Sequence, residues 1–312
     1  MKAGVVGAGA WGKNHVRTLH EMGCLGVVVE MSETLRASVR EEYPGVRVVS
    51  SLNGMLADES LSDVEAFVVA TPANTHAQIA EELFSARKHV LVEKPMTLNS
   101  SDAERIIEAS RQAGTTLMVG HLLLFQPAVQ FVKQFLSEGK LGAVYTLTQR
   151  RSKLGRARAV ENVLWSFGVH DVAVLLYLVG EAPIDTGASG HSAISEGIED
   201  DVHLHMKFAN GITANLHNSW LWPRVERELI VTGEKGLLVY DELNQQVILH
   251  RKGIGCDLQN VDEGEEVLFE GAAQPLQLEL EHFMECCEKG ETPIADGQNG
   301  LDVVRVLEVV GN

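Results

Sequence analysis

Two basic side chains, far apart in the sequence, are of types that could act in acid–base chemistry. Lys94 stands in Glu93-Lys94-Pro95, and His170 stands in Trp165-Ser166-Phe167-Gly168-Val169-His170-Asp171. An unperturbed imidazole has a pKa of about 6.5 and, when neutral, can accept a proton from an alcohol. An ammonium group stabilises the negative charge that then develops on the oxygen. Either group could serve proton transfer at a hydroxyl, but a lysine at a strand end is usually just exposed, and a lone histidine in a helical stretch is more often a hydrogen-bonded core residue.

A glycine-rich turn near the N-terminus predicts a dinucleotide site. Gly7-Ala8-Gly9-Ala10-Trp11-Gly12 follows a strand-like segment and opens a helical pattern. Glycines in this G-x-G-x-x-G spacing permit a tight turn and close approach to a pyrophosphate, which the positive end of the helix also attracts. Glu30 ends the next predicted strand, where its carboxylate can accept hydrogen bonds from ribose hydroxyls and repel a 2′-phosphate. These features favour NAD over NADP.

The first part of the chain, residues 1–121, alternates short β-branched segments with helical patterns, which predicts a doubly wound parallel sheet. The predicted strands are Ala3–Val6, Leu25–Glu30, Val46–Val49, Ala66–Ala70, His89–Glu93 and Thr116–Gly120. Helical patterns include Thr75–Ala86 and Asp102–Gln112, and Asn99 supplies a cap for the second of them. We expect a Rossmann domain over residues 1–121.

Residues 122–312 have a different pattern and predict a second α/β domain with a large, open, mostly antiparallel sheet. A helical stretch, Val163–Gly180, precedes consecutive strands joined by short turns. Those strands are Asp201–Phe208, Thr213–Ser219, Glu228–Thr232, Leu237–Tyr240 and Val247–His250, and two helical patterns, Gln277–Lys289 and Leu301–Val310, end the chain. We expect this domain to hold substrate and to form a homodimer or homotetramer through its exposed sheet, with the last helices packing back near the first domain.

Unusual residues follow the predicted strands at the edge where ligands of doubly wound sheets bind. Thr71, Pro72, Asn74 and His76 follow one strand, Glu93-Lys94-Pro95 follows the next, and Gly120-His121 follows a third. Pro95 disfavours the helical conformation at Lys94, so the lysine is held in place.

These segments together resemble the Gfo/Idh/MocA family of oxidoreductases, and the resemblance covers essentially the whole chain. It implies a nicotinamide beside Lys94, a cis peptide before Pro95, and a catalytic histidine at the position of His170. Lys94 and His170 are then the expected catalytic pair at one hydroxyl, with His170 as the base; the opposite assignment, with Lys94 as the base, stays open. It also assigns cofactor contacts to the three strand-end segments, from Thr71 to Gly120, and a substrate contact to His121. The family's D-x-G-x-H-x-x-D pattern is matched at Gly168 and His170, whereas Ser166 and Ala173 stand in place of its acids. Asp171 is then the candidate to orient the imidazole, although adjacent helical residues do not face each other.

A cluster of cations points to the substrate. Arg150, Arg151, Lys153, Arg156 and Arg158 fall within nine positions, between a predicted strand, Val144–Gln149, and the His170 helix. Such groups suit a diphosphate or a carboxylate, but a solvated basic loop is the alternative.

Within the family, Arg151–Gly155, Glu161–Ser166 and Asn218–Pro223 resemble the nucleotide-sugar 3-dehydrogenases. That resemblance implies UDP-N-acetylglucosamine, or its uronic acid, as substrate. The implied product is a 3-keto sugar for a partner aminotransferase, as in lipid A or polysaccharide biosynthesis. Arg151, Lys153, Arg156 and Trp165 are then expected to bind substrate. A free-polyol dehydrogenase and a non-catalytic sugar-sensing protein are the alternatives.

Composition excludes several other classes. The formal net charge of −17 disfavours nucleic-acid binding. No apolar run approaches the roughly 18–20 residues that span a membrane, and the absence of a leader pattern predicts a cytoplasmic protein. The four cysteines lack metal-ligand spacing, so no metal is expected; Cys286 and Cys287 are predicted to be buried free thiols.

Overall fold

The computed structural model describes residues 1–155, 157–271 and 273–309, and the chain divides into two compact units. The first unit comprises Met1–Leu122 and Leu276–Val304, and the second comprises Leu123–Pro275 and the residues from Arg305 onward. The last two helices therefore contribute mainly to the first unit, although they follow the second unit in the chain.

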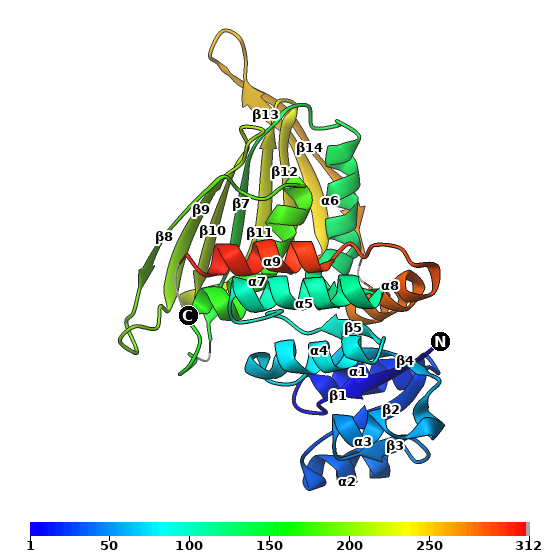
Figure 1. The fold of residues 1–312 in the computed structure, drawn as a ribbon. Helices are drawn as coiled ribbons and strands as arrows, with labels where there is room; N and C mark the ends of the chain where they lie inside the picture. The colour runs from blue at the N-terminus through cyan, green and yellow to red at the C-terminus, as the bar shows by residue number, and fades with distance from the viewer. Residues whose placement is uncertain (156, 272, 310–312) are drawn as a thin grey trace. The chain divides into compact units, whose positions relative to one another are not determined.

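The first unit is built on a six-stranded parallel sheet with the order β3-β2-β1-β4-β5-β6 (Figure 1). Its strands are β1 (Lys2–Val6), β2 (Leu25–Val29), β3 (Arg47–Val49), β4 (Val64–Val69), β5 (His89–Val92) and β6 (Leu117–Val119). Its helices are α1 (Gly12–Glu21), α2 (Glu33–Glu42), α3 (Leu52–Leu56), α4 (His76–Ser85), α5 (Ser100–Ala113) and most of α8 (Pro275–Lys289) and α9 (Gly297–Leu307). The predicted Rossmann sheet is confirmed, and all six strands lie within two residues of their predicted bounds.

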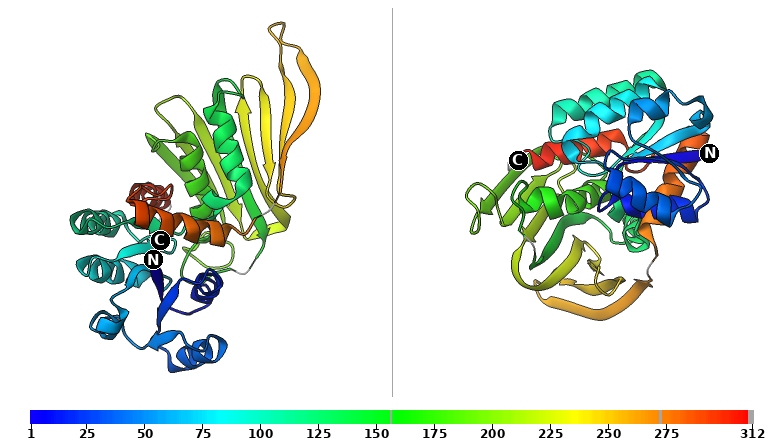
Figure 2. Two further views of the ribbon diagram at one scale, coloured as in Figure 1. Left: turned by 90° about the vertical axis from the view of Figure 1, so that its right-hand side faces the viewer. Right: turned by 90° about the horizontal axis from the view of Figure 1, so that it is seen from below.

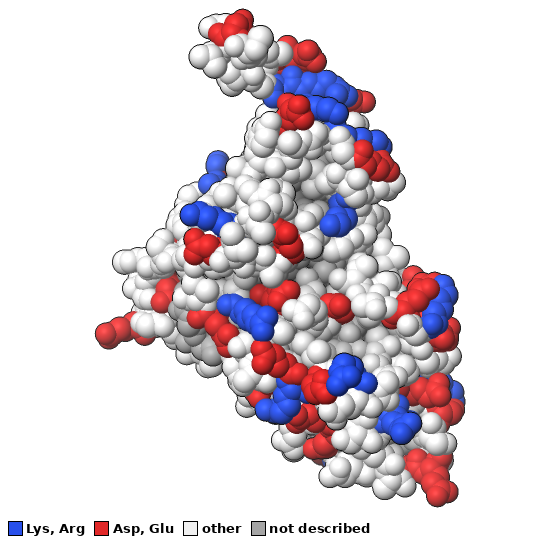
Figure 3. All heavy atoms as spheres, turned by 45° about the horizontal axis from the view of Figure 1, so that its top comes forward, with Lys and Arg blue, Asp and Glu red and all other residues white. Residues whose placement is uncertain are grey.

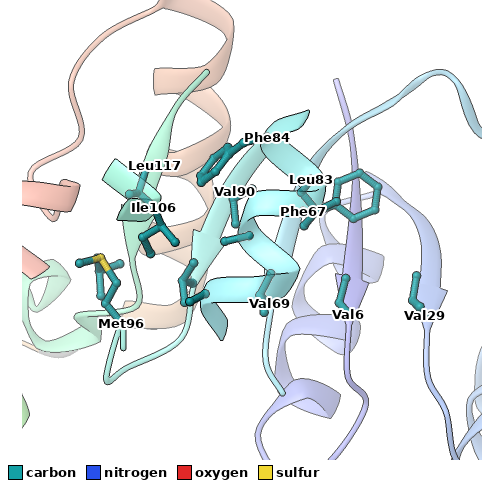
Figure 4. Packing of buried hydrophobic residues seen from close by; sticks show 14 of the residues in the cluster. Val6, Val29, Phe67, Val69, Leu83, Phe84, Val90, Met96, Ile106 and Leu117 are labelled. Carbon is teal, nitrogen blue, oxygen red and sulfur yellow. The ribbon is translucent and has the colours of Figure 1, made fainter. Parts of the chain in front are cut away.

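Apolar strands covered on both faces form the core of this unit. Phe67, Val69, Val90 and Val92 are completely buried, and Figure 4 shows α4 and α5 side chains packing against them. The near-continuous hydrophobic runs of β4 and β5 are typical of parallel strands with helices on both faces. Asn99 caps α5 as predicted, because its side chain accepts a hydrogen bond from the backbone N–H of Asp102 at 2.8 Å.

The second unit contains an eight-stranded sheet with the order β14-β13-β12-β11-β7-β10-β9-β8, in which β7 and β10 are the parallel pair. The strands are β7 (Val144–Leu154), β8 (Asp185–His191), β9 (Asp201–Lys207), β10 (Thr213–Ser219), β11 (Leu221–Gly233), β12 (Gly236–Asp241), β13 (Gln246–Ile254) and β14 (Asn260–Glu270). Helices α6 (Pro127–Ser137) and α7 (Val169–Val179) cover one face of this sheet, and among the described residues no helix of the unit covers its opposite face (Figure 2). The predicted large, mostly antiparallel sheet is confirmed.

The second unit differs from the sequence predictions in several elements, of which one strand end, one helix and two strands are the clearest. Strand β7 continues to Leu154 instead of ending at Gln149, because the cations that follow Gln149 have partners on the neighbouring strands and helix. The helix predicted for Val163–Gly180 is instead a π-helical turn, Leu164–Gly168, followed by α7. Strands β8 and β14 were not predicted, because both are largely exposed and lack a buried apolar face.

Charged residues of both signs are interspersed on the surface shown in Figure 3, and no broad basic area is present there. Within the described part of the chain, no helix combines the length and apolar character that a membrane span requires. The cysteine pair of α8 is buried as predicted, whereas Cys256 is exposed.

Candidate cofactor and active site

The glycine loop between β1 and α1 has the geometry of a phosphate cradle. Gly7 adopts a φ of +91°, and a Cβ on Gly12 would lie 2.0 Å from the carbonyl oxygen of Gly7. A side chain at either position is therefore incompatible with the close contact between loop and helix. Gly9 differs, because a Cβ built there meets no atom within 4 Å. This open space over the loop, at the positive end of α1, fits a pyrophosphate.

Glu30 follows β2 and faces this loop. Its Oε2 accepts a hydrogen bond from the backbone N–H of Ala8 at 2.7 Å, and its Oε1 accepts one from the backbone N–H of Ser32 at 2.8 Å. The carboxylate is thus oriented by the backbone beside the glycine loop. An acid held in this position suits ribose hydroxyls and opposes a second phosphate.

Glu93 connects the start of α1 to the end of β5. Its Oε1 accepts a hydrogen bond from the indole N–H of Trp11 and lies 2.6 Å from Nε2 of His15, while its Oε2 accepts the backbone N–H of Lys94 at 3.1 Å. Burial opposes ionisation of Glu93, but the hydrogen bond and charge of His15, together with the charge of Lys94, hold its pKa below the ordinary value. The ionised carboxylate therefore fixes the backbone at Lys94, and the Lys94–Pro95 peptide is cis, as the family resemblance implies.

Two further groups lie in the electrostatic environment of Glu93, and both are fully buried. Burial lowers the pKa of His121 to about 4, so its imidazole is neutral near pH 7. Glu279 of α8 was not predicted from the sequence. Burial, and then the charge of Glu93, raises its pKa well above the ordinary value. Neither of its carboxyl oxygens has a hydrogen-bond partner among the described residues, so the interior of the first unit favours the protonated form of Glu279.

The segment after β4 is braced by a buried histidine. Nε2 of His76 lies 2.8 Å from the carbonyl oxygen of Thr71, and Nδ1 lies 3.0 Å from that of Pro95. Pro72 immediately precedes, and Asn74 lies within, the short 3-10 turn Ala73–Thr75 that leads into α4. His76 thus connects the ends of β4 and β5, and a direct role in cofactor binding for Thr71, Pro72, Asn74 and His76 remains a prediction.

In the second unit, α7 directly follows the π-helical turn, and His170 is the second residue of α7. Such turns are rare and often occur at functional sites. Gly168 permits close packing here, because a Cβ on it would lie 2.4 Å from Oδ1 of Asn218. The turn therefore packs closely on β10 immediately before the candidate catalytic histidine.

Asp171 is bound to the sheet beneath α7. It is fully buried and accepts hydrogen bonds from Nε of Arg151 at 2.8 Å, from Gln149 at 3.2 Å and from Asn218 at 2.9 Å. The Arg151 guanidinium also pairs with both oxygens of Glu242 at 3.1 and 2.6 Å. Asp171 thus anchors the first turn of α7, which carries His170, to β7 and β10.

The predicted cations that the structure describes within residues 150–155 do not form one basic patch. Because side chains of a strand alternate between faces, Arg150 lies on the open face of the sheet while Arg151 and Lys153 lie on the helix-covered face. Arg151 is buried with its two acids, and the ammonium of Lys153 lies 5.4 Å from the ring centre of Phe167. Trp165, another predicted substrate residue, is buried. Arg156 lies outside the described residues.

A Rossmann unit with an open glycine loop and an oriented acid after β2, joined to a unit with a large sheet, defines a dinucleotide-dependent oxidoreductase. Residues 1–121 match the family model described as the Gfo/Idh/MocA oxidoreductase family with an NAD-binding Rossmann fold, and residues 129–239 match the Gfo/Idh/MocA C-terminal domain. The chain belongs to the Gfo/Idh/MocA family and is an NAD-binding oxidoreductase.

Individual relatives are similar over nearly the full chain. A UDP-N-acetylglucosamine 3-dehydrogenase of Acidithiobacillus ferrooxidans is 26% identical over 305 residues, which cover 97% of this chain and 94% of that protein. Its crystal structure superimposes with a TM-score of 0.87 over 99% of this chain and 96% of the other. A protein of Magnetospirillum magnetotacticum MS-1 is 30% identical, with a TM-score of 0.85 and 99% coverage of both chains. A myo-inositol 2-dehydrogenase of Thermotoga maritima is 24% identical over 96% of this chain and 92% of that protein.

Proposed function

We propose that this protein oxidises a secondary alcohol of a sugar to a ketone, with Lys94 and His170 acting on the reacting hydroxyl. The favoured substrate is UDP-N-acetylglucosamine, oxidised at C3. The 3-keto nucleotide sugar would then be consumed by a reaction that condenses a carbonyl with an amine, such as that of an aminotransferase.

The observation that carries this proposal is the support of Lys94 at the end of β5. The Glu93 carboxylate fixes the backbone N–H of Lys94 and also binds Trp11, which belongs to the NAD loop. The reactive lysine and the cofactor loop are thus connected through one buried acid. The backbone from which the Lys94 side chain extends is therefore fixed before substrate binds, which limits the conformational entropy lost on reaching the transition state.

The proposed chemistry divides the two hydrogens of the alcohol between two acceptors. His170 accepts the proton of the hydroxyl, and the ammonium of Lys94 stabilises the developing charge on the oxygen. Bound NAD supplies the hydride acceptor at its nicotinamide ring. Asp171 serves as a positioning residue, since its bonds to β7 and β10 hold the turn from which His170 projects. In this proposal the imidazole of His170 is the base. The neutral imidazole of His121 forms a hydrogen bond with the substrate.

Support for a nucleotide sugar comes from the named relative, which covers 97% of this chain, and from the segments shared with the 3-dehydrogenases. We place two of the predicted diphosphate ligands, Lys153 and Arg156, in direct contact with the substrate. Arg151 is already paired with Asp171 and Glu242. Breaking a buried ion pair costs free energy, so Arg151 is not expected to leave these acids for the substrate. We therefore assign Arg151 a positioning role in the site.

The test is a panel of UDP-sugars and free polyols, with NADH formation followed by absorbance. We expect UDP-N-acetylglucosamine to be the best substrate, free UDP to inhibit, and KM to rise with salt because the diphosphate binds cations. Lys94→Ala and His170→Ala should each reduce kcat by roughly 100-fold or more. Lys140→Ala, at an exposed lysine paired with Glu138, is the matched control and should retain full activity.

Different results would replace this proposal with named alternatives. Turnover of inositol or glucose in preference to every UDP-sugar would identify a polyol dehydrogenase. Binding of NADH without turnover of any compound would indicate a sugar-sensing protein. A fully active Lys94→Ala enzyme would contradict the mechanism for every substrate.

A further inference from the structure

We propose that the open face of the second unit's sheet carries a binding site for a divalent transition metal, with Zn²⁺ as the favoured ion. Its ligands are Asp201, His203 and His217, which we call the His–Asp cluster. Their ligating atoms all lie within 4.8 Å of one another. This site differs from the sequence expectation of no metal, and it is independent of the proposed oxidoreductase activity.

The register of β9 and β10 brings these residues together. His217 pairs directly across the ladder with His203, and Asp201 is two positions before His203 on the same face. Nε2 of His217 lies 3.2 Å from both carboxylate oxygens of Asp201, and Nε2 of His203 lies 3.7 Å from Oδ1. Both imidazoles thus direct the same nitrogen toward one carboxylate.

For two of the three side chains, His203 and Asp201, the surroundings favour the form that binds a metal. The pKa of His203 is lowered, first by partial burial and then by His217, so a neutral ring is favoured near pH 7. Partial burial opposes ionisation of Asp201, but hydrogen bonds from Ser219 and His217 hold its pKa below the ordinary value. Neutral imidazole and ionised carboxylate are the ligand forms of these residues.

Binding a metal would require rotation of the side chains from their present positions. The two rings stack with centres 4.1 Å apart and planes 5° from parallel. Zinc–nitrogen bonds are about 2.0–2.1 Å long, so metal binding must replace the hydrogen bond from Nε2 of His217 to Asp201, with the ring proton on Nδ1 instead, and small rotations must turn both Nε2 atoms toward a common point. A surface pocket of about 450 Å³ beside both rings leaves room for a water as fourth ligand.

Two imidazoles and one carboxylate suit Zn²⁺ and its neighbours in the first transition row more than Mg²⁺ or Ca²⁺, which prefer oxygen. Nδ1 of His217 is buried and has no hydrogen-bond partner among the described residues. Ligating histidines usually donate from that second nitrogen, and losing such a partner costs about 10–100-fold in affinity. We therefore expect a site weaker than those of dedicated zinc enzymes.

The experiment is a calorimetric titration of chelator-treated full-length protein with ZnCl₂. We expect one site per chain, weakened at least tenfold in His203→Ala and in Asp201→Asn. His205→Ala is the matched control, because His205 lies on the same strand and face but contacts Asn215 instead. His203 has an exposed side chain, so its replacement should leave the fold intact, as circular dichroism would verify.

Cobalt substitution distinguishes this cluster from the cysteines. Co²⁺ bound at the His–Asp cluster should give no thiolate charge-transfer absorption, whereas Co²⁺ at the exposed Cys256 would give it. The inference is overturned if the wild-type protein binds no Zn²⁺, if His203→Ala and Asp201→Asn titrate like wild type, or if the cobalt spectrum reports thiolate ligation.

Discussion

Alanine substitutions at Gly9 and Gly12 should separate the two tasks of the glycine loop. A Cβ on Gly12 would lie 2.0 Å from the carbonyl oxygen of Gly7, inside van der Waals contact with the backbone. Overpacking of this kind typically costs about 1–3 kcal/mol, so Gly12→Ala should lower the free energy of unfolding by at least that amount. A Cβ on Gly9 meets nothing within 4 Å, so Gly9→Ala should change stability by less than about 0.5 kcal/mol.

The same Gly9 methyl group would occupy the space that we assign to the pyrophosphate. Gly9→Ala should therefore weaken NADH binding by roughly tenfold or more, which corresponds to about 1.4 kcal/mol. Chemical denaturation without cofactor measures the first effect, and calorimetric titration with NADH measures the second. A Gly9→Ala protein that binds NADH like wild type would refute the assignment of the loop, and a Gly12→Ala protein of wild-type stability would refute the packing argument.

Three further predictions concern acids of the two units. Glu30→Ala should lower the preference for NAD over NADP by at least about tenfold, since it removes charged hydrogen bonds to the ribose; an unchanged ratio of the two dissociation constants would refute this. The raised pKa of Glu279 means that its contribution to stability is fully present below about pH 4.5 and is lost as pH rises, by at most about 1.4 kcal/mol per pH unit. Glu279→Gln should remove that loss. The prediction is contradicted if the free energies of unfolding of the variant and the wild type, measured in urea, change in parallel between about pH 5 and pH 7. Asp171→Ala leaves Arg151 buried with one partner fewer and should lower the free energy of unfolding by about 3–5 kcal/mol. Arg150→Ala, at the exposed pair with Glu226, should lower it by less than about 1 kcal/mol. Equal unfolding midpoints of the two variants would count against the role of Asp171 as an anchor.

Features that depend on local sequence were predictable. The strands of the Rossmann sheet are short apolar segments between helical patterns, and burial on both faces leaves little choice of conformation. The glycine loop was predictable because its conformation requires Gly7 and Gly12 at fixed positions. The cap at Asn99 was predictable because it also depends on local sequence: its side chain accepts a hydrogen bond from a backbone N–H in the first turn of the helix.

Features that depend on register or on distant contacts were not predictable. Arg151 looks like part of a basic loop in the sequence, but β7 continues past it, and alternation places its guanidinium beside Asp171 instead of beside Arg150. In the sequence, Glu279 looks like an ordinary acid of an amphipathic helix; its burial depends on the packing of α8 into the first unit. The His–Asp cluster arises from an antiparallel ladder that pairs residues 14 positions apart, a relation that no local pattern encodes.

The central claim is that the ammonium group of Lys94 takes part in the oxidation itself. The most direct test is the single-turnover rate of NADH formation by Lys94→Met, which keeps an unbranched chain but removes the charge, at saturating NAD and UDP-N-acetylglucosamine. We predict a rate reduced by roughly 100-fold or more relative to wild type, with NADH affinity retained. A single-turnover rate equal to that of wild type would contradict the account.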